Sequence, residues 1–276
     1  MLKLNESNLK IKNAGFFKPV FFKFLFKQNW KIIIIFAILI VFFSVGIAVI
    51  TAFTAPTSMS KPNFFTFIFN QLFPMSGSLF VILLVVLLNK STASLVDRGD
   101  LAYILCSRTS RKQIVLTTYF FSLMLVIVIV LMNFLIILAS GLYTWVNGIF
   151  IVQQFIIFLV LVSIANFISC LFNKTWMYFF VCSGLFIMFY MFNMIGNMGT
   201  TLAKQEPTMK WLADFKYVSI ITIFNIFFDG LSMDPDHFTP ILKAEGLIIC
   251  DCILVIICVA LVISSLVIFR KKDLPI

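Results

Sequence analysis

Long apolar runs alternate with short polar segments along most of the chain. Residues 32–53 contain no charged side chain, and about 20 such residues suffice for a helix to cross the hydrocarbon core of a bilayer. Five further runs have a similar composition. The pattern therefore predicts an all-α, polytopic membrane protein with six transmembrane helices. These spans are predicted at residues 32–53, 72–88, 114–140, 149–171, 176–197 and 246–269.

The segment before the first span, residues 1–31, is basic and aromatic. Lys23, Lys27 and Lys31 recur every four residues, and most of the other residues from Pro19 onward are apolar. A helix with this pattern has one cationic and one apolar face, which suits the surface of a membrane that contains anionic headgroups. We expect an N-terminal amphipathic interfacial helix in contact with membrane lipid on the cytoplasmic side.

Two long polar segments separate the spans. Residues 89–113 lie between the second and third spans and contain five basic and two acidic residues. Residues 198–245 form a large outer segment between the fifth and sixth spans. Within it, residues 217–228 are apolar but too short to cross a bilayer, which favours a re-entrant or interfacial piece. A helix buried in an outer cap is the alternative interpretation.

Composition and charge placement agree with a bilayer protein. The chain is 62% hydrophobic and 12% charged, with a formal net charge of +10, whereas a soluble domain is about one quarter charged. Sixteen of the 21 Lys and Arg residues fall on the side of the two termini. The excess of cations in cytoplasmic loops places both termini in the cytoplasm, in a plasma membrane. Because the charges flank apolar runs, no nucleic-acid partner is expected.

Motifs for catalysis, nucleotide binding and metal binding are missing from the sequence. There is no Gly-rich phosphate loop, so the chain is not expected to bind ATP itself. The six Cys have no zinc-ligand spacing with a companion His, and His237 is the single His. We therefore predict no enzymatic activity, no metal site and no cofactor bound by this chain.

A few polar and polarisable side chains inside the spans are candidates for a cargo path. Asp251 falls near the start of the sixth span, and an ionisable group at membrane depth points to a functional role. If that helix begins later, Asp251 lies among the lipid headgroups instead. Met191 and Met194 share one face of the fifth span with Asn193 nearby. Such a Met-rich face can adapt to varied apolar cargo, or it serves packing and lipid contact.

Residues 96–111, VDRGDLAYILCSRTSR, resemble the cytoplasmic loop of ATP-binding-cassette type-2 permeases. In that family an acidic residue and a Gly-Thr-Leu-like start follow the second span, and a Pro-x-Ser-Arg ending precedes the third. The matching residues are Asp97, Gly99, Leu101, Ile104, Leu105, Ser110 and Arg111. Asp100 stands where Thr is common, and Arg108 stands where Pro is common.

The resemblance continues in the order of segments. The amphipathic arm, the six spans, the segment DFKYVSIITIFN (214–225) and the basic ending FRKKDLPI are similar to the corresponding parts of these permeases. The resemblance implies a half-transporter that pairs with a second permease chain, the same or a related one. Each chain would dock a separate P-loop ATPase that binds ATP and Mg²⁺.

On the same resemblance, a coupling helix over about 92–106 would sit in a groove of the ATPase. The coupling residues would be Asp97, Arg98, Gly99, Asp100, Leu101, Arg108 and Arg111. The cargo would be amphipathic or hydrophobic, such as a peptide, a lipid-like molecule or a drug, and would be exported. Two alternatives stay open: residues 89–113 only fix topology as a solvated basic loop, or the protein is a non-transporting scaffold or sensor that binds partner proteins.

Overall fold

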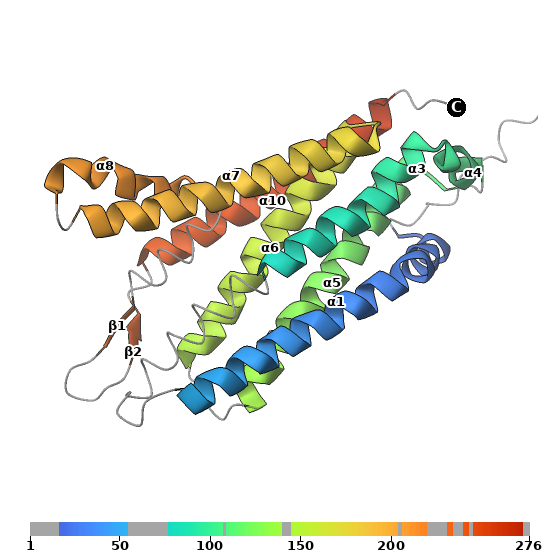
Figure 1. Ribbon diagram of the computed structural model, residues 1–276. Coiled ribbons are helices and arrows are strands. Elements are labelled where there is room, and N and C mark those ends of the chain that lie inside the picture. Colours follow the sequence, from blue (N-terminus) through green and yellow to red (C-terminus); the bar gives the residue numbers. More distant parts are fainter. Residues whose placement is uncertain are drawn as a thin grey trace, which may run out of the picture.

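The computed structural model describes residues 17–54, 77–106, 109–139, 145–203, 206–219, 231–233, 240–242 and 245–272. Within these residues, six helical segments are long and apolar enough to cross a membrane, which confirms the predicted helical architecture and the number of candidate spans. They pack as an elongated bundle (Figure 1). They are α1 (Pro19–Thr54), a helix described over Gly77–Asp97, α5 (Arg111–Ala139), α6 (Trp145–Leu171), α7 (Thr175–Leu202) and α10 (Glu245–Lys271).

The second candidate span, α5 and α6 form the centre of the bundle. At least half of the most apolar stretch of each is buried, against 17% or less in α1, α7 and α10. Phe80 of the second span packs on Phe158 of α6, with ring centroids 4.4 Å apart. The three outer helices carry apolar side chains on their exposed faces. Such faces are compatible with contact to lipid or to another membrane helix.

Helices α6 and α10 run in the same direction, side by side. Gln153 near the start of α6 is bonded to Asp251 near the start of α10, and Cys170 near the end of α6 accepts a bond from Lys272, just beyond the end of α10. Between these levels, Cys258 of α10 interacts with Ser163 of α6. The near-constant sequence offset of these three pairs requires a parallel arrangement.

Helix α1 joins the amphipathic arm to the first span without interruption. Phe21, Leu25 and Asn29 form its buried stripe, while Lys23, Lys27 and Lys31 are exposed. Asn29 Nδ2 donates to the Leu25 carbonyl at 2.9 Å. Figure 1 shows the first turns of α1 nearly end-on and the rest running diagonally, so the helix bends near its start. Val20, Phe24 and Phe26 are also exposed beside these lysines, and the interfacial position of the amphipathic arm stays a prediction.

The prediction of a loop beginning at residue 89 is wrong. The second span continues as a π-helical segment, η2 (Asn89–Ala93), and then as α3 (Ser94–Asp97). Asn89, Ser91, Thr92 and Ser94 are buried between helices rather than solvated, and the Ser91 hydroxyl donates to the Leu87 carbonyl. Lys90 and Asp97 are exposed. Hydroxyl groups that bond their own helix can be buried at low cost, which is why a polar run could remain helical.

The single coupling helix expected over about 92–106 is also wrong. Helix α3 ends at Asp97, and a separate helix, α4, covers Asp100–Cys106. Gly99 lies between them with a φ of 75°. Residues other than Gly rarely adopt this backbone conformation, so Gly99 stops one helix and allows the next to start in a new direction.

The described part of residues 198–245 turns back along α7. Three short helical turns follow α7: η3 (Pro207–Met209), α8 (Lys210–Ala213) and η4 (Asp214–Tyr217). Ser219 Oγ then donates to the Phe189 carbonyl at 2.9 Å. Further on, β1 (Leu231–Met233) pairs antiparallel with β2 (Pro240–Leu242), a small hairpin that the sequence did not predict. Most of the apolar piece 217–228 lies outside the described residues.

Candidate functional site

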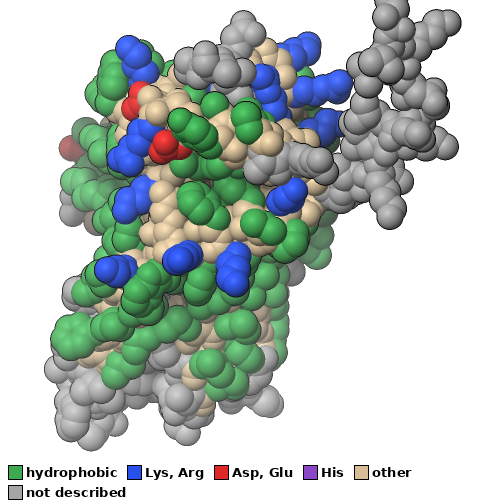
Figure 2. All heavy atoms as spheres, turned by 90° about the vertical axis from the view of Figure 1, so that its right-hand side faces the viewer, with side chains coloured by type: hydrophobic (Ala, Val, Ile, Leu, Met, Phe, Trp, Pro, Cys, Tyr) green, Lys and Arg blue, Asp and Glu red, His purple; other side chains and the backbone are tan. Residues whose placement is uncertain are grey.

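One end of the bundle collects the ends of all six candidate spans. Lys18 N, before α1, donates to Thr117 Oγ1 of α5 at 3.2 Å, and Arg111 at the start of α5 reaches the end of α10. Figure 2 views this end and shows Lys and Arg side chains gathered on it above a largely apolar surface. We call this surface the basic end. Its described cations are Lys18, Arg98, Arg111, Lys112, Lys174, Arg270, Lys271 and Lys272.

The turn from α3 to α4 is held by backbone hydrogen bonds. Arg98 N donates to Ser94 O, Gly99 N to Val96 O, and Ala102 N to Gly99 O, at 3.1 to 3.2 Å. A glycine in the left-handed conformation commonly closes a helix in this way. The turn thereby fixes the direction in which α4 leaves the second span.

Helix α4 has one face on the bundle and one in solvent. Leu101 is 2% exposed, and Ile104 and Leu105 also pack against the core. Asp100 and Cys106 are exposed, and Tyr103 between them is 80% exposed. Spacings of three residues keep the outward side chains on one face of the helix. The result is an anchored helix that presents an acidic and aromatic face outward.

Asp97 links this turn to α7. Its Oδ2 accepts a hydrogen bond from the backbone nitrogen of Thr175, the first residue of α7, at 3.3 Å. The side chain of Lys174, the N-cap residue of α7, makes no capping hydrogen bond to the helix. A carboxylate at a helix N-terminus is favoured by the unpaired N–H groups and by the helix dipole. The exposed turn is therefore attached to the start of an outer helix.

Arg111 and Lys272 fasten the other helix ends together. Arg111 Nη1 donates to the carbonyls of Arg270 at 3.1 Å and Lys272 at 2.6 Å. Lys272 Nζ in turn donates to the carbonyls of Cys170 at 2.7 Å and Phe172 at 2.9 Å. Burial lowers the pKa of Lys272 to about 8, so the ammonium form still dominates at neutral pH.

Ser110 and Gln113 close the start of α5. Gln113 N donates to Ser110 Oγ at 3.2 Å, and Ser110 N donates to Gln113 Oε1 at 3.0 Å. This reciprocal arrangement is a capping box, which fixes the first turn of a helix. It sets the point at which the chain re-enters the bundle after α4.

The proposed coupling residues therefore divide into different structural roles. Arg98 and Asp100 are exposed and Leu101 is the buried anchor of α4. Gly99 is the hinge between the two short helices. Asp97 contacts α7, and the guanidinium of Arg111 bonds α10 within the bundle. Arg108 lies outside the described residues.

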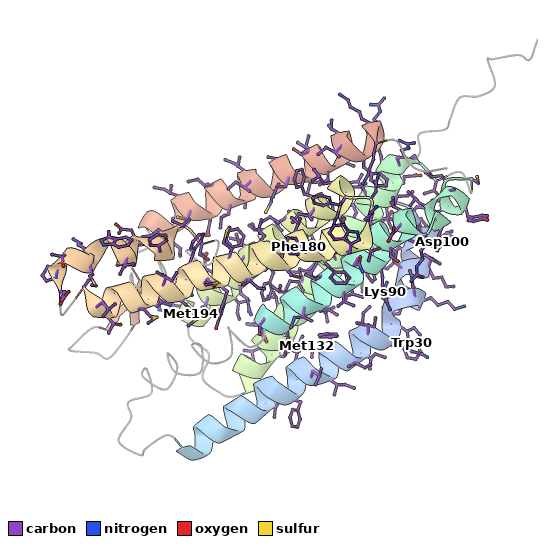
Figure 3. The ribbon with its side chains drawn as sticks, turned by 45° about the horizontal axis from the view of Figure 1, so that its top comes forward. Trp30, Lys90, Asp100, Met132, Phe180 and Met194 are labelled. Carbon is purple, nitrogen blue, oxygen red and sulfur yellow. The ribbon has the colours of Figure 1, made fainter. Side chains whose placement is uncertain are left out.

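The candidate cargo-path residues lie on two different helices, α10 and α7. Asp251 is partly buried on the side of α10 that packs on α6. Met191 and Met194 are each about half exposed on the outer helix α7, where Asn193 is partly buried. Figure 3 shows Met194 on α7 well away from Asp100, which lies at the opposite end of the bundle. The sequence pattern alone could not show that Asp251 contacts α6 whereas Met191 and Met194 lie on an exposed face of α7.

Gln153 is the main polar residue that the sequence analysis missed. It is 2% exposed, and its Nε2 donates to Asp251 Oδ2 at 2.8 Å. The pair Gln153–Gln154 in an apolar span was the available signal, because two adjacent amides are costly there without partners.

Other pockets and clusters add little chemistry. An apolar groove of about 640 Å³ lies between α1 and α5, lined by residues such as Ile38, Phe42 and Met132; Figure 3 shows Met132 beside α1. Within the described part of the chain, no group of three or more His, Cys, Asp or Glu side chains could hold a metal ion.

Comparison with known proteins gives no family for this chain. No protein-family model matches it, and no curated protein matches it either.

Proposed function

We propose that this protein is the membrane permease subunit of an ATP-binding-cassette transporter, and that it exports an amphipathic or hydrophobic cargo. A separate P-loop ATPase would bind ATP and Mg²⁺ and dock on the basic end. A second permease chain, the same or related, would complete the path. The basic end would face the cytoplasm of the cell, with both termini on that side, in the plasma membrane.

The observation that carries this proposal is the attachment of α4. The helix is anchored by Leu101 and presents Asp100 and Tyr103 outward. A short, anchored helix of this kind can seat in a groove of a partner protein, because its outward face is already ordered and little entropy is lost on docking. The resemblance of residues 96–111 to permease loops supports an ATPase as that partner.

A docked partner could transmit a displacement into the membrane through two contacts. The hinge at Gly99 joins α4 to the second span, and the Asp97 carboxylate joins the same turn to the first residue of α7. A partner whose two states push differently on α4 would then bias the positions of two spans. Such differential contact is what energetic coupling between sites requires.

Transport is tested by reconstituting the chain with its copurified ATPase in vesicles. The proposal predicts ATP-dependent accumulation of a fluorescent amphipathic cargo inside inverted vesicles, abolished by removal of Mg²⁺. An ATPase that binds the chain but never responds to any cargo, with no solute movement, would favour the scaffold or sensor instead. That result would contradict the transport function while leaving the docking site in place.

A further inference from the structure

The contact between Gln153 and Asp251 leaves two oxygen atoms without partners. Gln153 Nε2 donates to Asp251 Oδ2, whereas Gln153 Oε1 and Asp251 Oδ1 have no hydrogen-bond partner among the residues that the structure describes. The Gln153 side chain is almost completely buried, with 2% of its surface exposed. Leaving a buried acceptor unpaired is costly, so the pair is suited to a ligand that donates hydrogen bonds.

The pair lies more than one helical turn inside α6 and α10. Asp251 is six residues from the start of α10 and Gln153 is eight residues from the start of α6. At 1.5 Å per residue, these are depths of about 9 and 12 Å from the helix ends. Both lie at the end opposite the basic end, because α6 and α10 run in parallel toward it. A carboxylate at this depth is expensive unless a cation neutralises it.

The chain supplies no such cation among the residues that the structure describes. The side chain that stabilises the Asp251 carboxylate is the Gln153 amide, and the neighbouring ionisable group is the Cys250 thiol. Both unpaired atoms are acceptors, so the missing partner is a donor. A primary ammonium carries three N–H donors and a positive charge, and therefore satisfies the carboxylate and the amide oxygen together.

Apolar side chains lie beside Asp251 on the surface of α10. Ile248 and Val255 precede and follow Asp251 at spacings of three and four residues, and both are exposed. Residues at those spacings lie beside Asp251 on the helix surface. A molecule whose ammonium reached Asp251 would therefore place an attached hydrocarbon chain against these residues.

We propose that Gln153 and Asp251 form a recognition site for the ammonium group of a cationic amphiphile, and that the cargo belongs to this class. The inference rests on the proposed transport function, since it names the chemistry of the cargo. The Asp251 carboxylate neutralises the charge, Gln153 Oε1 accepts a second hydrogen bond, and Ile248 and Val255 receive the hydrocarbon.

The test uses the full chain in nanodiscs of zwitterionic lipid and a photoreactive dodecylamine as the probe. Labelling is measured by mass spectrometry over a range of probe concentrations, beside a photoreactive dodecanol of the same length. In Asp251→Asn, the half-saturating amine concentration should rise about tenfold or more, because a charge-assisted bond is lost. Asn keeps an oxygen that can accept the bond from Gln153. The proposed site would be overturned if the unsubstituted chain and Asp251→Asn gave the same amine labelling curve. It would also be overturned if the unsubstituted chain bound the alcohol as tightly as the amine.

A second pair of variants keeps the test independent of the folding of Asp251→Asn. Gln153 and Gln154 are adjacent and both are 2% exposed, but only Gln153 is bonded to Asp251. Gln153→Leu should weaken amine binding severalfold and Gln154→Leu should not; equal effects would overturn the assignment. The assay contains no ATPase. Loss of the amine site with ATPase capture intact would therefore overturn only this inference, and amine binding without ATPase capture would support it while contradicting the permease assignment.

Discussion

The carboxylate of Asp97 accepts a hydrogen bond from the backbone nitrogen of Thr175 at 3.3 Å, 78 residues along the chain. This contact joins the exposed turn after the second span to the first turn of α7. Because Gly99 follows two residues later and starts α4 in a new direction, the same short segment holds a helix with an exposed face and a connection to an outer span.

Replacing Asp97 with Ala should uncouple ATP hydrolysis from cargo movement. The substitution removes the acceptor for Thr175 N, while α4 and its outward face are left in place. We expect the ATPase to copurify with the variant at the wild-type level, but ATP-driven uptake in vesicles to fall to a small fraction of the wild-type rate.

Asp97→Asn is the matched control, since its amide oxygen can still accept the bond. It should retain most of the transport that Asp97→Ala loses. If both variants transported normally, the contact with Thr175 would not participate in coupling.

Replacing Gly99 with Ala should destabilise the turn. No atom lies within 4 Å of the position that an added Cβ would occupy, so the effect comes from the backbone alone. A left-handed conformation costs an L-residue roughly 1–2 kcal/mol. Thermal unfolding in detergent should show a lower midpoint, and ATPase capture should weaken as α4 shifts.

Gly184→Ala in α7 is the control for Gly99→Ala. Its added Cβ also meets nothing within 4 Å, and no positive φ is recorded there. Because Ala favours a helix over Gly by about 1 kcal/mol, its midpoint should be unchanged or higher. A loss of stability as large in Gly184→Ala as in Gly99→Ala would contradict the hinge.

Lys272→Met should separate the end of α10 from the turn between α6 and α7. The carbonyls of Cys170 and Phe172 both lose a charged donor. A hydrogen bond to a charged group contributes up to about 3 kcal/mol to stability. We expect a loss of about 1–3 kcal/mol in the free energy of unfolding, measured by denaturant titration. Lys271→Met removes the adjacent exposed cation and should change the free energy of unfolding by less than about 0.5 kcal/mol. If the two substitutions had equal effects, the bonds from Lys272 to the carbonyls of Cys170 and Phe172 would not contribute to stability.

Gly199→Ala should displace the segment that returns along α7. The added Cβ would lie 2.5 Å from the backbone carbon of Leu212 and 2.6 Å from the nitrogen of Ala213, so the short helices must move away. Hydrogen–deuterium exchange should become faster over residues 206–219, with little change at the basic end. Unaltered exchange in that segment would contradict the close packing of Gly199 on α8.

The sequence was sufficient to predict what depends on local hydrophobicity. Uncharged runs such as residues 32–53 have the length and composition of spans, and the structure forms helices there. The cationic spacing of Lys23, Lys27 and Lys31 likewise predicted a two-faced helix, whose apolar stripe is buried at Phe21 and Leu25. These features follow from helix periodicity, which is visible in a single sequence.

The parts that could not be predicted depend on partners far away in the chain. Ser91 and Thr92 look like loop residues, but they are buried because α6 and α7 pack over η2. The Asp251 partner is Gln153, 98 residues away. Arg111 looked like a docking residue, yet its guanidinium is bonded to the end of α10. Hydrophobic periodicity carries no information about which polar groups meet across helices.

The measurement that tests the central claim most directly is capture of partners by the tagged full chain from its native membranes in mild detergent, read by mass spectrometry. The account predicts a stoichiometric P-loop ATPase, with capture reduced at least tenfold when Asp100 and Tyr103 on the exposed face of α4 are both replaced by Lys. Replacing Lys112 and Lys271, exposed elsewhere on the basic end, with Gln serves as the control and should preserve most of the capture. Recovery of the intact chain without an ATPase, under conditions that hold a known permease and its ATPase together, would contradict the account.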